Sequence, residues 1–239
     1  MFWLPASHKG AGVTGKEDFM KLTRRDFALT AAAFAAAGGS ALAQNKIQLQ
    51  RRIEFTPQQR EDLDRVSAYL NSITTLGAQF VQMNAQGSVS RGEFYLARPG
   101  KLRFEYRPPS PQLIVATGGN IYVRNSHLNT VDRYSVQDTP LGLLVADAIN
   151  LRGNSAVLGI DRQPGQLLLR TRSSTNRMQD NIQIVFATEP ALQLRQWTVR
   201  EAQGGSTSVA LSGVQTGMPI APESFAIPVK APVIRKSGT

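Results

Sequence analysis

Apolar and polar residues alternate over two neighbouring runs near the middle of the chain. Leu102, Phe104 and Tyr106 alternate with charged residues, and a similar alternation begins at Phe94. A period of two places one apolar and one polar face on a β-strand. Residues 98–100 between the runs read Arg-Pro-Gly, and proline and glycine both favour a turn at such a break. The two runs therefore predict a hairpin with aromatic side chains on one face.

The period of two recurs before and after this hairpin and predicts a mainly β protein. The further runs are residues 75–80, 112–117, 120–124, 127–134, 156–161, 166–172, 181–187, 192–201 and 206–214. Short turns between successive strands favour antiparallel neighbours, because parallel strands need long crossovers. About eleven strands are expected, and an antiparallel sheet of that length tends to curl and leave a concave side.

A helix is predicted ahead of the first strand. Thr56 and Pro57 supply an N-cap and a proline at the first helical position. One apolar stripe follows, with spacings of three and four between its members Leu63, Val66, Leu70 and Ile73. This helix is expected to lie on an apolar surface.

A second, shorter helix is predicted after the sixth strand. Thr139 and Pro140 repeat the start signal, and residues 141–149 are apolar nearly all round. Two interpretations stay open: a core helix that fills the sheet, or a mobile lid that exposes apolar surface when it opens. Near the end of the chain, residues 222–225 read Pro-Glu-Ser-Phe and predict one helical turn.

The pattern of residues at the start of the chain predicts an export signal. Residues 23–27 read Thr-Arg-Arg-Asp-Phe, a twin-arginine signature, and residues 28–39 are a short alanine-rich apolar run. Ala43 ends a small-x-small cleavage site. The apolar run is shorter than the roughly 20 residues that a membrane span needs. We therefore expect residues 1–43 to be cleaved, with Met1 or Met20 as the start, and residues 44–239 to form a single domain.

Charge and cysteine content narrow the function classes. The net charge is +10, but the basic residues are scattered along the strands. This scatter favours a solvated outer sheet face over a nucleic-acid surface, and it suits contact with anionic membranes. There is no cysteine, so the domain depends on packing alone and has no residue for a lipid anchor.

The sequence offers little chemistry for catalysis. It contains no Gly-x-Ser-x-Gly elbow, no phosphate-binding glycine loop and no zinc motif, and His127 is the only histidine after the leader. A lone histidine is more often a surface residue than a base or a ligand. We therefore expect no enzyme activity, no metal and no cofactor. Arg98 has two open interpretations, a solvated turn residue or a latch whose guanidinium holds helix carbonyls.

Large apolar residues are abundant on the faces predicted to point inward. They form either an ordinary core or the lining of a pocket on a partly closed sheet, where an acyl chain gains about 0.8 kcal/mol per buried CH₂. The candidate lining residues are Phe80, Phe94, Leu96, Leu102, Phe104, Tyr106, Leu113, Val115, Ile121, Val123 and Trp197, with Leu141, Leu144 and Val145 from the second helix.

Several of these segments together resemble the outer-membrane lipoprotein carrier proteins of the LolA family. The resemblance rests on the hairpin of residues 92–106 with Arg98-Pro99, the turn of residues 118–122, the Thr-Pro-Leu of residues 139–141 and the Pro-Glu-Ser-Phe of residues 222–225. It implies an incomplete antiparallel β-barrel of about 11 strands covered by an α-helical lid. It also implies a soluble periplasmic carrier, with Arg98 holding the lid closed.

The resemblance also implies partners. They are acylated lipoproteins as cargo, an inner-membrane ABC-type release complex, and an outer-membrane receptor or the membrane surface; a monomer is expected, and no nucleic acid. Two features depart from the family: Leu102 and Phe104 stand where Phe and Trp are frequent, and a twin-arginine leader is unexpected. The alternatives are a periplasmic carrier or sensor of another lipid, such as a phospholipid or glycolipid, and, further off, an enzyme on the same fold.

Overall fold

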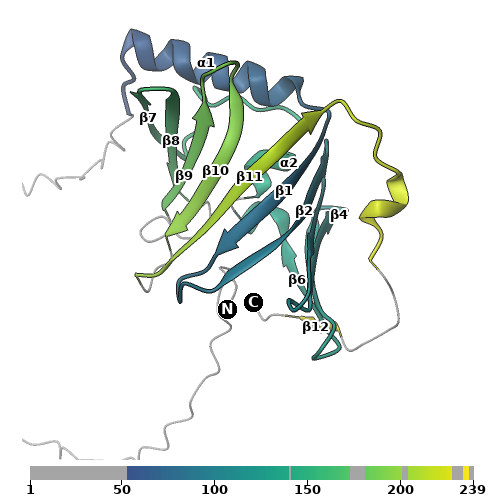
Figure 1. The fold of residues 1–239 in the computed structure, drawn as a ribbon. Helices are drawn as coiled ribbons and strands as arrows, with labels where there is room; N and C mark the ends of the chain where they lie inside the picture. The colour runs from purple at the N-terminus through teal and green to yellow at the C-terminus, as the bar shows by residue number, and fades with distance from the viewer. Residues whose placement is uncertain (1–52, 140, 173–180, 201–203, 228–233, 237–239) are drawn as a thin grey trace, which may run out of the picture. The chain divides into compact units, whose positions relative to one another are not determined.

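The computed structural model describes residues 53–139, 141–172, 181–200, 204–227 and 234–236 (Figure 1). All of them belong to one compact unit of the chain. The expected export signal, residues 1–43, lies outside the described residues, and so does Pro140.

One continuous antiparallel sheet dominates the fold. Its strands are β1 (Thr75–Met83), β2 (Val89–Ala97), β3 (Lys101–Tyr106), β4 (Gln112–Thr117), β5 (Asn120–Asn125), β6 (Thr130–Ser135), β7 (Val157–Gln163), β8 (Gln166–Arg172), β9 (Asn181–Ala187), β10 (Gln193–Arg200) and β11 (Ser206–Thr216). The strand order is β6-β5-β4-β3-β2-β1-β11-β10-β9-β8-β7, and a short β12 (Ile234–Lys236) adds to β6 in parallel. The outermost strands, β12 and β7, are not paired with each other. The predicted open antiparallel barrel of about eleven strands is therefore confirmed.

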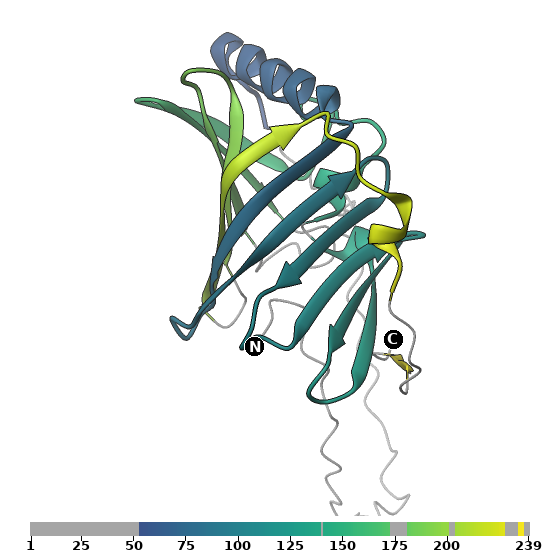
Figure 2. The ribbon, with the colours of Figure 1, turned by 45° about the vertical axis from the view of Figure 1, so that its right-hand side comes forward.

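The sheet curls strongly around a concave face (Figures 1 and 2). Its register shifts within β1, β7 and β10, and such irregularities increase local twist and bending. Gly92 shows how tightly the concave side of β2 packs, since a Cβ built there would lie 2.7 Å from the Phe80 ring and 2.0 Å from the Glu105 carbonyl oxygen. A larger residue at position 92 would force the backbone of β3 at Glu105 to shift and would also displace the Phe80 ring.

Helix α1 (Pro57–Ser72) starts where the sequence predicts and lies across one end of the sheet (Figures 1 and 2). Thr56 and Gln59 form a reciprocal capping box, which satisfies two otherwise unpaired backbone N–H groups. The predicted stripe of Leu63, Val66 and Leu70 is buried. The helix therefore closes that end of the concave face.

The second predicted helix is much shorter than expected. Only α2 (Gly142–Val145) is helical, after a 3₁₀ turn η1 (Val136–Asp138), and Ala146 has already left the helical conformation, with φ −57° and ψ 145°. Its carbonyl groups bind tertiary partners: the Val145 carbonyl accepts from the Gly100 N–H at 2.8 Å, and the Ala146 carbonyl accepts from Arg98. These contacts replace the hydrogen bonds that would have continued the helix.

The outer face of the sheet carries a small separate cluster. Phe225 lies in η2 (Pro222–Phe225), the helical turn that the sequence predicts, and packs against β4. The Arg103 guanidinium donates to the Ser224 carbonyl at 3.0 Å. The segment after β11 is thereby attached to the convex side, away from the concave core.

Candidate functional site

The floor of the concave face is a group of interlocking aromatic rings. Phe94 lies 4.7 Å from Phe104 and 5.9 Å from Trp197, measured between ring centroids. Phe80 lies 5.2 Å from Phe104 and 4.9 Å from Tyr106, both in edge-to-face geometry. Such pairs add stability beyond their buried area. The floor therefore joins β1, β2, β3 and β10 into one rigid surface.

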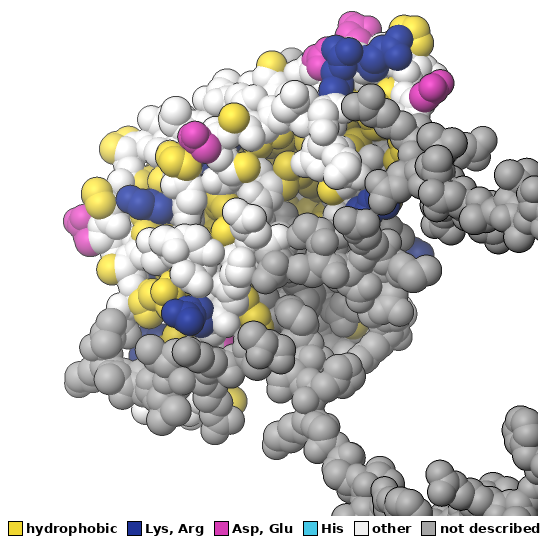
Figure 3. Space-filling model, turned by 180° about the vertical axis from the view of Figure 1, so that it is seen from behind, with side chains coloured by type: hydrophobic (Ala, Val, Ile, Leu, Met, Phe, Trp, Pro, Cys, Tyr) yellow, Lys and Arg dark blue, Asp and Glu magenta, His cyan; other side chains and the backbone are white. Residues whose placement is uncertain are grey.

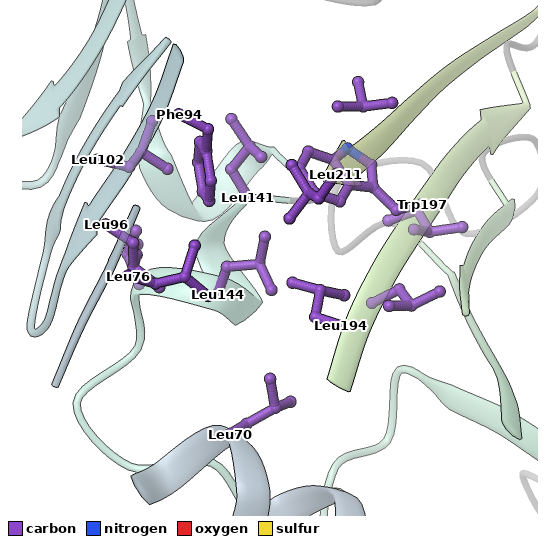
Figure 4. Close-up of a cluster of buried hydrophobic side chains, with 14 of the residues drawn as sticks. Leu70, Leu76, Phe94, Leu96, Leu102, Leu141, Leu144, Leu194, Trp197 and Leu211 are labelled. Atoms are coloured by element: carbon purple, nitrogen blue, oxygen red, sulfur yellow. The ribbon is translucent and has the colours of Figure 1, made fainter. Parts of the chain in front are cut away.

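A short loop-and-helix segment fills the space above this floor. We call residues 141–151 the plug segment. In Figure 4, Leu141 and Leu144 lie between Phe94 and Leu76 on one side and the side chains of β10 and β11 on the other. Leu141, Leu144 and Val145 are each at most 5% exposed. Seen from the opposite side to Figure 1, the described part of the surface shows hydrophobic side chains between polar ones (Figure 3).

Most of the predicted lining residues meet in this concave core. They are Phe80, Phe94, Leu96, Leu102, Phe104, Tyr106, Ile121, Val123, Leu141, Leu144, Val145 and Trp197.

The prediction for Leu113 and Val115 is wrong. Both side chains belong to the outer cluster around Phe225, on the other face of β4. The concave positions of β4 are Ile114 and Ala116, and Ile114 is paired with Phe104 on the neighbouring strand. The run Leu-Ile-Val-Ala is apolar on both faces, so the period of two gives no direction there.

Arg98 stands at the end of β2 and links α1 to the plug segment. Its Nη2 and Nε donate to the Ala146 carbonyl at 2.6 and 2.9 Å, and Nη2 also lies 3.1 Å from the Asp147 carbonyl oxygen. Its Nη1 donates to the carbonyl of Leu70 in the last turn of α1. A cation in this position also complements the negative end of the helix dipole. Burial lowers the pKa of Arg98, and the nearby Asp147 carboxylate partly opposes that shift.

Two polar residues of α1 hold the far end of the plug segment, and no sequence pattern pointed to them. The Asn71 side chain donates from Nδ2 to the Ile149 carbonyl at 2.8 Å and accepts from the Ile149 N–H at 2.9 Å. The Ser67 hydroxyl accepts from the Leu151 N–H at 3.1 Å. Both are polar residues beside the apolar stripe of α1. Solvent-facing residues of a helix occupy the same kind of position, so the sequence does not single these two out.

The described residues contain no cluster of three or more acidic or histidine side chains that suits a metal ion. His127 is exposed in the turn between β5 and β6. Tyr106, whose pKa is raised by burial, donates from its hydroxyl to Gln82 Oε1 at 2.7 Å. No helix in the part of the chain that the structure describes is long and apolar enough to cross a membrane.

Fold and site together define an open antiparallel half-barrel with an apolar interior and a short segment hydrogen-bonded into it. Comparison with known proteins specifies the class further. The family model for the outer membrane lipoprotein carrier protein LolA matches residues 71–228, and the chain belongs to this family.

Curated relatives carry the same name. The chain is 28% identical to the outer-membrane lipoprotein carrier protein of Chromohalobacter salexigens, over 73% of this chain and 87% of the relative. It is 26% identical to that of Methylococcus capsulatus, over 72% and 83%. Among solved structures, an uncharacterized conserved protein of Thermus thermophilus matches with a TM-score of 0.47 and 14% identity, over 75% of this chain and 99% of the other.

Proposed function

We propose that this protein is a periplasmic carrier that holds the acyl chains of lipoproteins in its concave core while they cross to the outer membrane. The proposal rests on one observation: the middle of an apolar half-barrel is occupied by a plug segment with one turn of helix, held at its near end by Arg98. A ligand that displaces Leu141, Leu144 and Val145 gains the same apolar surroundings. No covalent chemistry is required.

The energies of the exchange are of comparable size. Removing three buried side chains of the plug segment from the core costs about 1.5–3 kcal/mol each. An acyl chain that buries roughly 12 CH₂ groups gains on the order of 10 kcal/mol at about 0.8 kcal/mol per group. Ordering of the chain and loss of the Arg98 hydrogen bonds reduce that gain. The gain and the costs are therefore of similar size, and an exchange so close to balance suits reversible binding.

Membership of the lipoprotein carrier family supports a proposed route. The expected export signal would deliver the protein to the periplasm. We propose that an ABC-type release complex in the inner membrane loads the cargo and that an outer-membrane acceptor receives it. The plug segment must leave the core for loading and return to it for release.

The test is release of lipoproteins from membranes. Purified mature protein is incubated with spheroplasts, and acylated lipoproteins are expected in the supernatant as a complex with it. Leu102→Glu places a charge on the core side of β3 and should abolish loading, because an acyl chain bound there would remove water from the carboxylate at a large cost in free energy. Val185→Glu, on a half-buried position of β9 between two core residues, is the matched control and should load normally.

Folding of each variant is checked by circular dichroism and urea titration, and Ile121→Asn replaces Leu102→Glu if the latter fails to fold. Normal loading by a folded core variant would contradict the proposed site. If no lipoprotein appears and mass analysis of an extract finds a phospholipid or glycolipid instead, the half-barrel carries that lipid and the lipoprotein cargo is wrong.

A further inference from the structure

A groove lies at the end of the sheet opposite to Arg98 and α1. It has a volume of about 380 Å³ and sits where β1 ends, β2 begins and β3 passes into β4; we call it the tip groove. Its lining residues are Gln82, Asn84, Val89, Ser90, Arg91, Arg107, Pro108, Pro109, Ser110 and Gln112.

The lining of the tip groove favours an anion. It combines two arginines with amide and hydroxyl groups, and it contains no carboxylate. Arg107 pairs with Glu93, which lies outside the lining. Arg91 is exposed and forms no ion pair with any residue that the structure describes. A guanidinium with free donors and nearby amides is well suited to phosphate oxygens.

Exposed apolar side chains flank the same arginine. Val81, Met83 and Val89 are 38%, 51% and 51% exposed, and they make up most of the large hydrophobic side chains exposed on the described surface. Met83 is paired with Val89, and Val81 is paired with Arg91, so the four residues are cross-strand neighbours at the tip of the β1–β2 hairpin. Apolar side chains beside cations are typical of surfaces that lie in the headgroup region of a bilayer.

The tip groove also abuts the aromatic floor. Gln82 lines the groove and accepts the hydrogen bond from the Tyr106 hydroxyl, and the Tyr106 ring packs 4.9 Å from Phe80. A polar site and the apolar core are therefore separated by a single hydrogen-bonded pair. An amphiphile at a membrane surface has the matching order of polar head and apolar chain.

We propose that the tip groove binds the phosphate headgroup of an anionic phospholipid at a bilayer surface. Arg91 contacts the phosphate, and Met83 and Val89 enter the interface beside it. The charge complementarity and the adjoining apolar patch favour a bilayer over a free anion, because a free anion would leave the exposed apolar side chains in water. The inference rests on the proposed function in one respect: a carrier between two membranes must contact their surfaces, which explains why a membrane-binding site would be useful.

The experiment is vesicle sedimentation with cargo-free, full mature protein. We expect binding to vesicles that contain phosphatidylglycerol and little binding to pure phosphatidylcholine vesicles. Arg91→Glu should weaken binding to the anionic vesicles about tenfold or more, since it removes a basic residue that contributes about 1 kcal/mol and adds a negative charge that the surface repels. Met83→Asp should weaken it as well. Lys101→Glu makes the same charge change at an exposed position of β3 near Arg98 and should have less than a threefold effect.

Three results would overturn the proposal. The first is equal binding to anionic and neutral vesicles. The second is equal weakening by Lys101→Glu and Arg91→Glu, which would show diffuse attraction to net positive charge. The third is binding of dispersed short-chain phosphatidylglycerol without vesicle binding, which would place the site on free lipid. Arg91→Gln replaces Arg91→Glu if folding fails. Spheroplast loading, measured in parallel, reports the carrier function separately, so failure of one leaves the other standing.

Discussion

Leucines of the β-strands form one set and leucines of the plug segment form another, and both fill the same core. The backbones that carry the two sets are held in place by different hydrogen bonds. Leu102 stands on β3, which is paired along both sides with β2 and β4. Leu144 stands on the plug segment, whose near end depends on the Arg98 guanidinium and one backbone bond from Gly100. Both side chains are at most 4% exposed. Burial alone therefore does not distinguish the two segments; the hydrogen bonds of their backbones do, and the proposed function requires movement only of the plug segment.

The largest expected effect comes from shortening one leucine of each set. Leu144→Ala weakens the packing of the plug segment by about 2 kcal/mol or more, and a ligand that displaces this segment should bind about tenfold or more tightly. Displacement of a fluorescent fatty acid measures this affinity. Leu102→Ala is the matched truncation and should cost about 2–5 kcal/mol in urea unfolding without raising affinity. Equal gains in affinity for both variants would remove the distinction between floor and plug.

A smaller effect is expected at the latch. Arg98→Leu removes the donors to Leu70, Ala146 and Asp147. Because Arg98 is partly exposed and water can replace these bonds, their loss together should cost only about 1–2 kcal/mol. Binding of ligand should persist, while its transfer to acceptor vesicles should slow roughly tenfold because the plug segment returns less readily. Stopped-flow transfer of a fluorescent lipid measures the rate.

Arg98→Lys refines this test. Lysine keeps the charge but lacks the planar fork that reaches several carbonyls at once, so an intermediate transfer rate is expected. A wild-type rate in Arg98→Leu would show that the hydrogen bonds seen here have no part in release.

The smallest effect on transfer is expected at the other end of α1. Asp62, which is 2% exposed, accepts two hydrogen bonds from Arg162 Nε and one from Nη2, which ties α1 to β7. Asp62→Asn should lower the urea midpoint and leave ligand transfer within twofold of wild type, because this contact does not involve the plug segment. If it slows transfer as much as Arg98→Leu does, then α1 as a whole moves.

The strands could be predicted from the sequence because apolar and polar residues alternate along each half-buried strand. Residues 112–117, 166–172 and 181–187 match β4, β8 and β9 at both ends. The face of β4 could not be read, since both of its faces are apolar and Phe225 covers the second one from more than 100 positions away. The short parallel β12 carries no alternation and was not predicted.

An interaction of Arg98 with carbonyl groups could be expected from the sequence, but the short length of α2 could not. The position of Arg98 beside a turn suggested an interaction with helix carbonyls, because arginine has several donors in a fixed geometry. The length of α2 was overestimated, since it depends on acceptors that Arg98 and Gly100 occupy. Asn71 and Ser67 contact backbone groups about 80 positions away, and local pattern contains no information on such contacts.

For the proposed carrier, the double hydrogen bond between Asn71 and Ile149 would affect how an acyl chain leaves. While these hydrogen bonds hold Ile149 in place, a displaced Leu144 is only five positions along the chain from a fixed point and stays close to its site in the core. It then competes with the acyl chain as an intramolecular rival, at an effective concentration of the order of millimolar or above. Such competition does not weaken when the protein is diluted, so unloading is governed by the tether and the acceptor membrane and not by the amount of carrier in the compartment.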